Sequence, residues 1–504
     1  MANGVPGISP SDAADSLSPR RHWAQLDTVA GRVFNCLMED ISTAEDQAFS
    51  ACLPLPLTPW EMMMHAEDQP DYPMISVIEL NFSGGVERHA MNAALHSALA
   101  RAPLLRACIR ERPLRRPQWI LAEELPEIHW MEAGTPLAGE FGARIDLQAQ
   151  AGIRIWARHD AQRVDFHLEL HHCCCDGVGV FQFIEDVLVD YANRTAIDGP
   201  ALPLRRLDAG ALKSRGNHLA KSDGPRQWLS KPFLTAREGY NFGFRRPRPL
   251  AADSPADTDG PAVEAFLVFR DDGGLLRRLR QAAAQLKVTL NDLLLRDLFL
   301  AVRQWNAAAG REESDDVIKI AMPCNLHAPA HAATPAANIM SYAFLTRRAP
   351  QLEDQAKLLG GIRQETESIR DTNAALCFLG VLGLASRVPG AMKFVSDLRA
   401  CFATAVLSML GDPTRGFFAR FPRCDGRLVV GNLVLDGIAA WPPVRPHTAA
   451  GLVVSTYADR LTIALKRDRQ TLSGADATKF LDLYKARLGA RTLYECAKMA
   501  ATWH

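Results

Sequence analysis

Two adjacent histidines, three cysteines, an aspartate and a glycine form the most distinctive stretch of the chain, from His171 to Gly177. A neutral imidazole accepts a proton near neutral pH, and a carboxylate close by can hold the loop that carries it. The spacing therefore suggests a positioned general base with structural support, which is the chemistry of acyl transfer. The plainer interpretation is a structural histidine pair beside an aspartate that only caps a helix.

The residues before the motif predict a strand that delivers it. Residues 163–170 alternate polar and apolar side chains, as in a half-buried strand. Its apolar side holds Val164, Phe166, Leu168 and Leu170. Continuing the two-residue period predicts that His172 faces inward and His171 outward.

The residues after the motif predict a helix. Apolar side chains recur at helical spacing in Phe181, Ile184 and Leu188, so the motif is the turn from a strand into an amphipathic helix. Asp176 then occupies the N-cap position of that helix, and Gly177 follows it.

The motif resembles the signature of the chloramphenicol acetyltransferase-like superfamily, which includes nonribosomal condensation domains, polyketide-associated acyltransferases and wax ester synthases. Leu57–Glu61 resembles the substrate-facing opening of a stand-alone condensation-type acyltransferase. Further similar segments are Leu99–Arg106, Asn291–Leu295, Met322–Leu326, Pro335–Asn338 and Pro442–Pro446, so the resemblance covers roughly residues 50–490. It implies an α/β fold of two related lobes with mixed sheets, arranged as a V-shaped pseudo-dimer.

The resemblance also implies the activity. Such an acyltransferase moves an acyl group from coenzyme A, or from the phosphopantetheine thioester of a carrier protein, to a hydroxyl or amine acceptor. His172 would be the general base, without an acyl-enzyme, and the thioester would be a co-substrate rather than a bound cofactor. The alternative is a non-catalytic, condensation-like docking module of a biosynthetic assembly line.

Three further residues enter through the resemblance. In the family, an arginine of the second half usually braces the motif aspartate, but the matching segment here ends in His327. Three alternatives stay open for the brace of Asp176: another arginine, a neutral hydrogen bond from His327, or a shifted alignment. Ser408 is a candidate hydroxyl donor to an oxyanion, and Asn338 either orients the cleft or holds a turn.

The three consecutive cysteines raise two other interpretations. A zinc site usually spaces its ligands, whereas adjacent cysteines at a strand end point to opposite faces, so we predict no metal. Small buried thiols under the loop are the favoured interpretation. A nucleophilic Cys174 or Cys175 with a ping-pong route is a minor alternative.

Composition limits the class of protein. Lysine and arginine number 57 and so do aspartate and glutamate, which gives no charge bias toward nucleic acid. The odd count of 11 cysteines without a framework pattern favours reduced thiols and a cytoplasmic setting.

The longest apolar run, Ala374–Ser386, is shorter than the roughly 20 residues of a transmembrane helix, so we expect a buried helix that could also wall an acyl channel.

Composition shifts along the chain predict its organisation. Residues 1–22 are expected to be a disordered tail, 23–204 the first lobe with the histidine motif, 205–261 a connector, and 262–504 the second lobe. Within the second lobe, residues 265–269 are predicted to be a strand, and 275–286, 290–305 and 351–373 to be helices.

Overall fold

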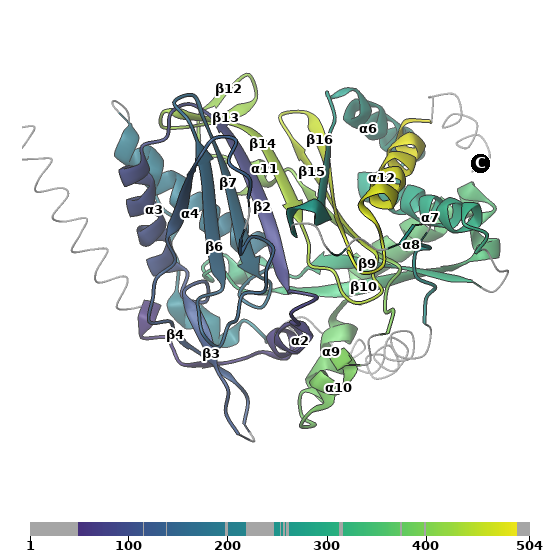
Figure 1. The fold of residues 1–504 in the computed structure, drawn as a ribbon, viewed down its shortest axis with the longest axis horizontal. Coiled ribbons are helices and arrows are strands. Elements are labelled where there is room, and N and C mark those ends of the chain that lie inside the picture. The colour runs from purple at the N-terminus through teal and green to yellow at the C-terminus, as the bar shows by residue number, and fades with distance from the viewer. Residues whose placement is uncertain are drawn as a thin grey trace, which may run out of the picture. The chain divides into compact units, whose positions relative to one another are not determined.

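The computed structural model describes residues 49–490, apart from 114, 138, 197–199, 218–245, 253, 256–257, 259–261, 312–315, 373–374 and 398–399. Its larger sheet has seven strands (Figure 1). In spatial order these are β12 (Arg423–Cys424), β13 (Arg427–Val430), β14 (Leu433–Trp441), β2 (Ile75–Ser83), β7 (Arg163–His171), β6 (Ile153–His159) and β5 (Ile128–Glu132). The β5–β6 pair is parallel and the other pairs are antiparallel, so this sheet is mixed.

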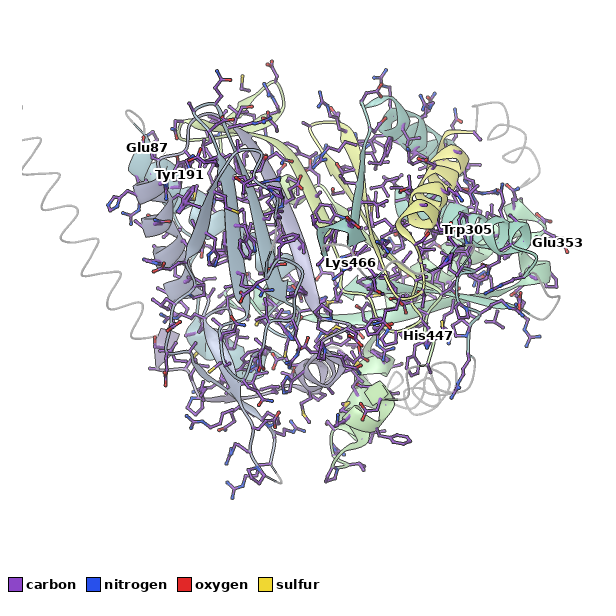
Figure 2. All side chains as sticks on the ribbon, in the orientation of Figure 1. Glu87, Tyr191, Trp305, Glu353, His447 and Lys466 are labelled. Atoms are coloured by element: carbon purple, nitrogen blue, oxygen red, sulfur yellow. The ribbon has the colours of Figure 1, made fainter. Side chains whose placement is uncertain are left out.

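Two helices cover one face of this sheet, α3 (Arg88–Arg101) and α4 (Gly177–Thr195) (Figure 1). Tyr191 of α4 links the start of α3 to the segment before β14. Its hydroxyl accepts the N–H of Glu87, at the start of α3, at 3.1 Å and donates to Asn432, before β14, at 2.8 Å (Figure 2). Nearby lie α2 (Pro59–Glu67) and a small sheet in the order β1 (Leu55–Pro56), β4 (Gln118–Leu121), β3 (Ala107–Arg110).

The second large sheet has six strands, all from residues after 265. Its order is β10 (Met340–Arg348), β9 (Val317–Asn325), β11 (Ala405–Gly411), β15 (Ala450–Tyr457), β16 (Arg460–Arg467) and β8 (Phe266–Arg270). Strand β11 runs parallel to both neighbours, whereas the other pairs are antiparallel. This sheet is therefore mixed as well.

Helices of the second half and short 3-10 turns complete the fold. The helices are α6 (Gly274–Leu286), α7 (Leu290–Ala308), α8 (Gln355–Thr372), α9 (Ala375–Ala385), α10 (Ala391–Asp397), α11 (Pro413–Gly416) and α12 (Gly474–Gly489). The 3-10 turns are η1 (Ala209–Ser214), η2 (Ala262–Ala265), η3 (Pro329–His331) and η4 (Ala349–Leu352). No helix in the described ranges combines the length and apolar character that crossing a membrane requires.

The two sheets do not follow the division of the chain. Strands β12, β13 and β14 come from the second half but complete the first sheet, where β14 pairs with β2. Lys466 of β16 lies between the sheets in Figure 2, and its ammonium donates to the Ile75 carbonyl of β2 at 3.3 Å. The sequence predicted two halves but not this exchange of strands.

Most of the predicted elements are present. The strand predicted over 163–170 is β7, that over 265–269 is β8, and the helices predicted over 275–286 and 290–305 are α6 and α7. The helix predicted over 351–373 begins later, at Gln355, because η4 occupies its first residues. The predicted tail and residues 23–48 of the predicted first lobe lie outside the described residues, as do 218–245 of the predicted connector and 491–504 of the second lobe.

Candidate active site

Strand β7 ends at His171, and both of its faces are buried near that end. Val164, Phe166, Leu168 and Leu170 form the apolar face as predicted. The opposite face was predicted to be exposed, but Glu169 and His171 are each 0% exposed. The prediction that His171 points outward is therefore wrong. A second apolar cluster, formed by Leu137, Phe141, Val77, Ala439, Trp441 and Ala464, covers this part of the sheet.

The partners of His171 identify it as a structural residue. Its Nδ1 accepts the backbone N–H of Cys173 at 3.1 Å, and its Nε2 lies 3.4 Å from the carboxylate of Asp68. Arg144 pairs with the same carboxylate at 2.5 Å. Burial lowers the pKa of His171, although Asp68 acts against this shift, so the neutral ring with a proton on Nε2 fits the site.

His172 lies beyond the strand, in the turn that follows it, so the strand period does not set its direction. Its backbone N–H donates to the Met74 carbonyl at 2.7 Å. Its Nδ1 lies 3.2 Å from the Cys175 carbonyl, which requires the proton on Nδ1 and leaves Nε2 as the acceptor. The imidazole is half-buried rather than fully buried, and Nε2 has no hydrogen-bond partner among the described residues.

The surroundings of His172 favour its neutral form. Burial lowers the pKa of the imidazole below its ordinary value, although the Asp176 carboxylate and the Cys175 carbonyl shift it the other way. A neutral imidazole with a free Nε2 can accept a proton, which is the requirement for a general base.

Asp176 is a buried N-cap that ties three segments together. Its carboxylate accepts the N–H of Gly179 in α4 and the N–H of Ile339 in the second half, each at 2.8 Å. Nε2 of His327 lies 3.0 Å from the same carboxylate. Of the three alternatives for the brace, the structure therefore has His327 in the place of the arginine. Burial raises the pKa of Asp176, but His327 and the two N–H groups outweigh it and leave the pKa lowered.

Asn338 orients the motif loop rather than only a local turn. Its amide donates to the carbonyl of His172 at 2.9 Å and to that of Cys173 at 2.8 Å. Asn338 belongs to the second half, between η3 and β10. Two backbone groups of the first half are thus fixed by one side chain of the second.

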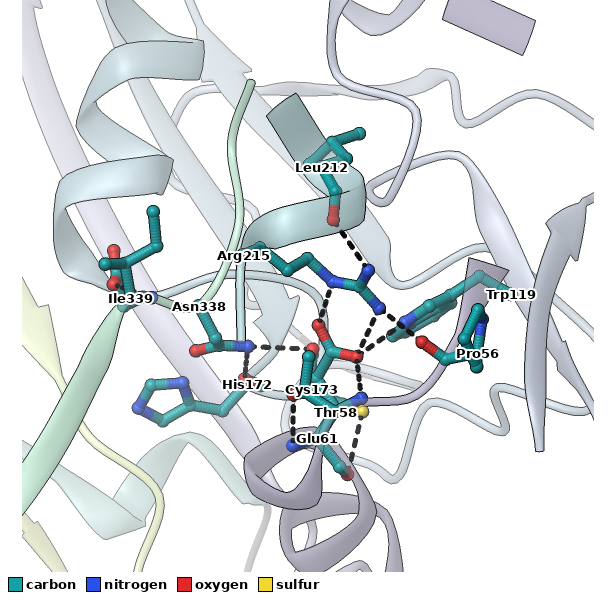
Figure 3. Close-up of polar contacts among 11 residues, drawn as sticks. Pro56, Thr58, Glu61, Trp119, His172, Cys173, Leu212, Arg215, Asn338 and Ile339 are labelled. Carbon is teal, nitrogen blue, oxygen red and sulfur yellow. Dashed lines mark hydrogen bonds and ion pairs between the residues drawn. The ribbon is translucent and has the colours of Figure 1, made fainter. Parts of the chain in front are cut away.

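A buried ion pair lies under the loop, and Figure 3 shows the imidazole of His172 pointing away from it. Both carboxylate oxygens of Glu61 lie 2.7 Å from the Arg215 guanidinium. Trp119 and the Thr58 N–H donate to the same carboxylate, and the Cys173 thiol lies 3.2 Å from the Glu61 carbonyl. The segment Leu57–Glu61, expected to face substrate, instead starts α2 with a capping box and buries Glu61.

The sequence did not identify Asp68 or Arg215. Arg215 follows η1 in what was predicted to be a connector, and nothing in its neighbours points to a partner 154 residues earlier. Asp68 ends α2 without a motif around it. Only the capping pattern Thr58 to Glu61 was readable from the sequence.

The cysteine triplet is a packing element. Cys173, Cys174 and Cys175 are all buried, and burial raises the pKa of each thiol. A β-carbon on Gly152 would lie 2.1 Å from the Cys174 sulfur, so that thiol fills a space that glycine leaves. Within the described ranges, no group of three or more His, Cys, Asp or Glu side chains could hold a metal ion.

The remaining predicted residues lie at the start of α4 and on β11. Gly177 begins α4, where a β-carbon would make an ordinary 3.6 Å contact with Leu410. The tight position is Gly179, whose β-carbon would lie 3.0 Å from the Ala337 backbone. Ser408, two residues before Leu410 on β11, makes no side-chain hydrogen bond to another described residue.

A cavity lies beside the motif. Its volume is ≈ 50 Å³, or ≈ 570 Å³ when the open space around it is included, and Met74, whose carbonyl holds His172, lines it. Tyr342 of β10 and Val406 of β11 line it as well. Trp60 of α2 contacts Tyr342, with ring centroids 5.2 Å apart.

Solved structures share this fold, although no family model and no curated protein sequence matches the chain. The epimerization domain of the third module of tyrocidine synthetase B has a TM-score of 0.62 at 15% identity, covering 90% of this chain and 98% of that one. The starter condensation domain of rhizomide synthetase has a TM-score of 0.61 at 11% identity, with 86% and 94% covered. Polyketide synthase associated protein 5 from Mycobacterium tuberculosis has a TM-score of 0.57 at 16% identity, with 86% and 98% covered.

These similarities extend over most of each chain, and both large sheets of this protein are mixed, as the resemblance of the histidine motif implied. The chain therefore has the two-lobed chloramphenicol acetyltransferase-like fold of condensation domains.

Proposed function

We propose that this protein is an acyltransferase that moves an acyl group from a thioester to a hydroxyl or amine acceptor. The observation that carries the proposal is the geometry of His172: Nδ1 is held by the Cys175 carbonyl, whereas Nε2 is unpartnered and accessible. Such a group can take the proton of an attacking alcohol or amine. The attack on the thioester carbonyl forms a tetrahedral oxyanion, this intermediate collapses with cleavage of the C–S bond, and the imidazolium returns the proton to the departing thiolate.

The support around His172 fits this role. Asn338 and the Met74 carbonyl fix the backbone of the base, and Asp176 fixes the start of α4. Preorganisation of this kind allows one general base to contribute about 10²–10⁴-fold. Ser408 is our candidate for a hydroxyl that donates to the tetrahedral oxyanion.

The donor is proposed to be coenzyme A or the phosphopantetheine arm of a carrier protein. The rhizomide synthetase structure is a complex with C8-CoA and Leu-SNAC, which supports thioester substrates for this fold. Of the two acceptor classes we favour a hydroxyl, and therefore ester formation.

A non-catalytic docking module is the competing function. Its sequence argument was the loss of the bracing arginine, but His327 lies 3.0 Å from Asp176 and supplies that contact. The brace of the loop is thus no reason to prefer the docking module.

The deciding experiment is mass-spectrometric detection of acylated products. Wild type and His172→Ala are incubated with a panel of acyl-coenzyme A donors and mixed alcohols and amines, and thermal unfolding confirms that both are folded. We expect products from wild type that disappear in the variant. Equal product from both would overturn the role of His172. No product from either, together with stable capture of a carrier protein, would favour the docking module.

A further inference from the structure

The cavity beside the motif has one polar corner. Glu67 at the end of α2 is only 6% exposed, and its carboxylate lies 2.8 Å from Nε of Arg445. The guanidinium carbon of Arg445 lies 4.6 Å from the ring centroid of Phe402. The phenol of Tyr342 lines the same cavity.

Some hydrogen-bond donors at this corner have no partner among the described residues. The terminal nitrogens of Arg445 and the hydroxyl of Tyr342 make no hydrogen bond to another described residue. Arg445 keeps 21% of its side chain exposed while it lines the cavity. A guanidinium carries donors only, and a phenol can donate as well, so the corner offers donors to an oxygen.

The charged side chains at this corner disfavour a charged occupant. Glu67 and Arg445 cancel each other, and no other charged side chain lines the cavity within the described residues. A carboxylate or an ammonium on a bound molecule would therefore add one uncompensated charge to a site with low exposure, and burying an unpaired charge is strongly unfavourable. An uncharged hydroxyl or carbonyl avoids this penalty.

The rest of the wall is apolar except for Thr448, whose hydroxyl donates to the Ala403 carbonyl at 3.1 Å. Three methionines and three aromatic rings supply most of it: Met63, Met64, Met74, Phe344, Phe378 and Phe402. Methionine side chains adapt their shape to a bound apolar group, and aromatic rings give it a large contact area. The occupant is therefore mainly apolar, with one polar end.

Two routes connect the cavity to the motif. Met74 contributes its side chain to the cavity and its carbonyl to the His172 N–H. On β11, Val406 lines the cavity, Ser408 follows on the same face, and the Leu410 side chain reaches the start of α4 at Gly177. The cavity and the motif are therefore neighbours in the structure, joined through Met74 and β11.

We infer that this cavity binds an uncharged, largely apolar substrate group that ends in a hydroxyl or carbonyl oxygen, with Arg445 and Tyr342 as its hydrogen-bond donors. That the occupant is a substrate rests on the proposed acyltransferase function. Both the acyl chain and the acceptor can carry such a group.

The first test measures binding alone, by isothermal titration calorimetry with three probes of one skeleton: phenylbutanol, phenylbutyrate and phenylbutylamine. We expect the alcohol to bind wild type at least about tenfold more tightly than either ion, because each ion leaves a charge unpaired. Equal affinities for the three probes, or no binding of any, would overturn the inference.

Variants then reverse the charge of the corner. Glu67→Gln leaves Arg445 uncompensated and should shift the preference to phenylbutyrate, whereas Arg445→Met leaves the carboxylate and should shift it to phenylbutylamine. The matched controls are Glu353→Gln and Arg387→Met, which make the same changes at exposed positions outside the cavity. Thermal unfolding checks that each variant is folded. If either charge variant fails to fold, probe binding is measured with Tyr342→Phe in its place, which removes only the hydroxyl donor.

Kinetic assays assign the group to one substrate. Octanoyl-coenzyme A is compared with its ω-hydroxy form, and octanol with octanediol. If the acyl chain fills the cavity, Arg445→Met raises KM for the hydroxylated donor only, and if the acceptor fills it, KM rises for the diol only. Selective probe binding without any acyl transfer would leave the cavity assignment standing and count against the proposed function. Acyl transfer without selective probe binding would support the proposed function and count against the cavity assignment.

Discussion

Nε2 of His171 lies 3.4 Å from the carboxylate of Asp68, and neither side chain reaches solvent. The first histidine of the motif is thereby tied to the end of α2, and its Nδ1 holds the N–H of Cys173. The second histidine, His172, has the accessible Nε2. One histidine of the pair fixes the loop, and the other keeps a ring nitrogen available for the chemistry that we propose.

His171→Ala should therefore destabilise the protein much more than His172→Ala. The first change removes a buried ring and leaves the Cys173 N–H and the Asp68 carboxylate short of a partner, which costs roughly 2–4 kcal/mol. The second removes a half-buried ring and should cost less than about 1 kcal/mol. Urea unfolding measures both. Acyl transfer per folded molecule should survive the His171 change and vanish with His172; the opposite result at equal stability would exchange their roles.

The sequence predicted the path of the chain through the motif correctly because local patterns encode it. The two-residue period gave β7, the helical spacing gave α4, and Asp176 followed by Gly177 gave the cap between them. It was wrong for the direction of His171 and did not set the direction of His172, for two physical reasons. The period was extended past His171, where the strand already ends, and the face assigned to solvent is covered by Phe141 and Trp441.

Contacts between distant segments were harder to predict. His327 could be proposed as a brace because a known pattern placed an arginine there. Arg215 under the loop and Asp68 beside His171 had no such pattern, and their partners, Glu61 and His171, lie far away in the sequence. Burial of a charged side chain depends on what the tertiary fold places around it, which no local window contains.

The pH dependence of catalysis should follow His172. Burial lowers the pKa of its imidazole, so the ring remains neutral and able to accept a proton at pH values where an exposed histidine is already protonated. The plot of kcat/KM against pH should thus fall on the acidic side with an apparent pKa below about 6.5. A midpoint clearly above that value would mean that another group limits the acidic side.

The stability of the loop should depend on the charge of Asp176. The pKa of its carboxyl is lowered in the folded protein, so its contribution is complete above the ordinary carboxyl value and is lost as the pH falls through the lowered value. Asp176→Asn should flatten the stability profile on the acidic side, from the ordinary carboxyl range downward. Asp176→Ala should cost at least about 2 kcal/mol throughout, because the cap and two buried N–H groups lose their acceptor. Unchanged acid sensitivity in Asp176→Asn would contradict this assignment.

The cysteine triplet should be chemically inert in the folded protein. Cys173, Cys174 and Cys175 are buried and burial raises the pKa of their thiols, whereas Cys424 is exposed. Short iodoacetamide treatment with peptide mapping should label Cys424 and spare the triplet, and activity should change by less than about twofold. Recovery of an acylated peptide containing Cys174 or Cys175 would instead support a ping-pong route.

The Glu61–Arg215 pair lies under the loop, on the side away from the His172 imidazole (Figure 3). Arg215→Met leaves a buried carboxylate without its cation and should destabilise the protein by about 3–5 kcal/mol. Glu61→Gln should cost a similar amount, but the double variant should cost clearly less than the sum, because neither charge then remains alone. Urea unfolding of the four proteins completes this cycle, with the exposed Arg415→Met as a control. Strictly additive costs would show that the two side chains act separately.

Activity of the double variant adds a second measurement. The carbonyl of Glu61 contacts the Cys173 thiol, so a loop that depends on the pair should lose acyl transfer even where stability has partly returned.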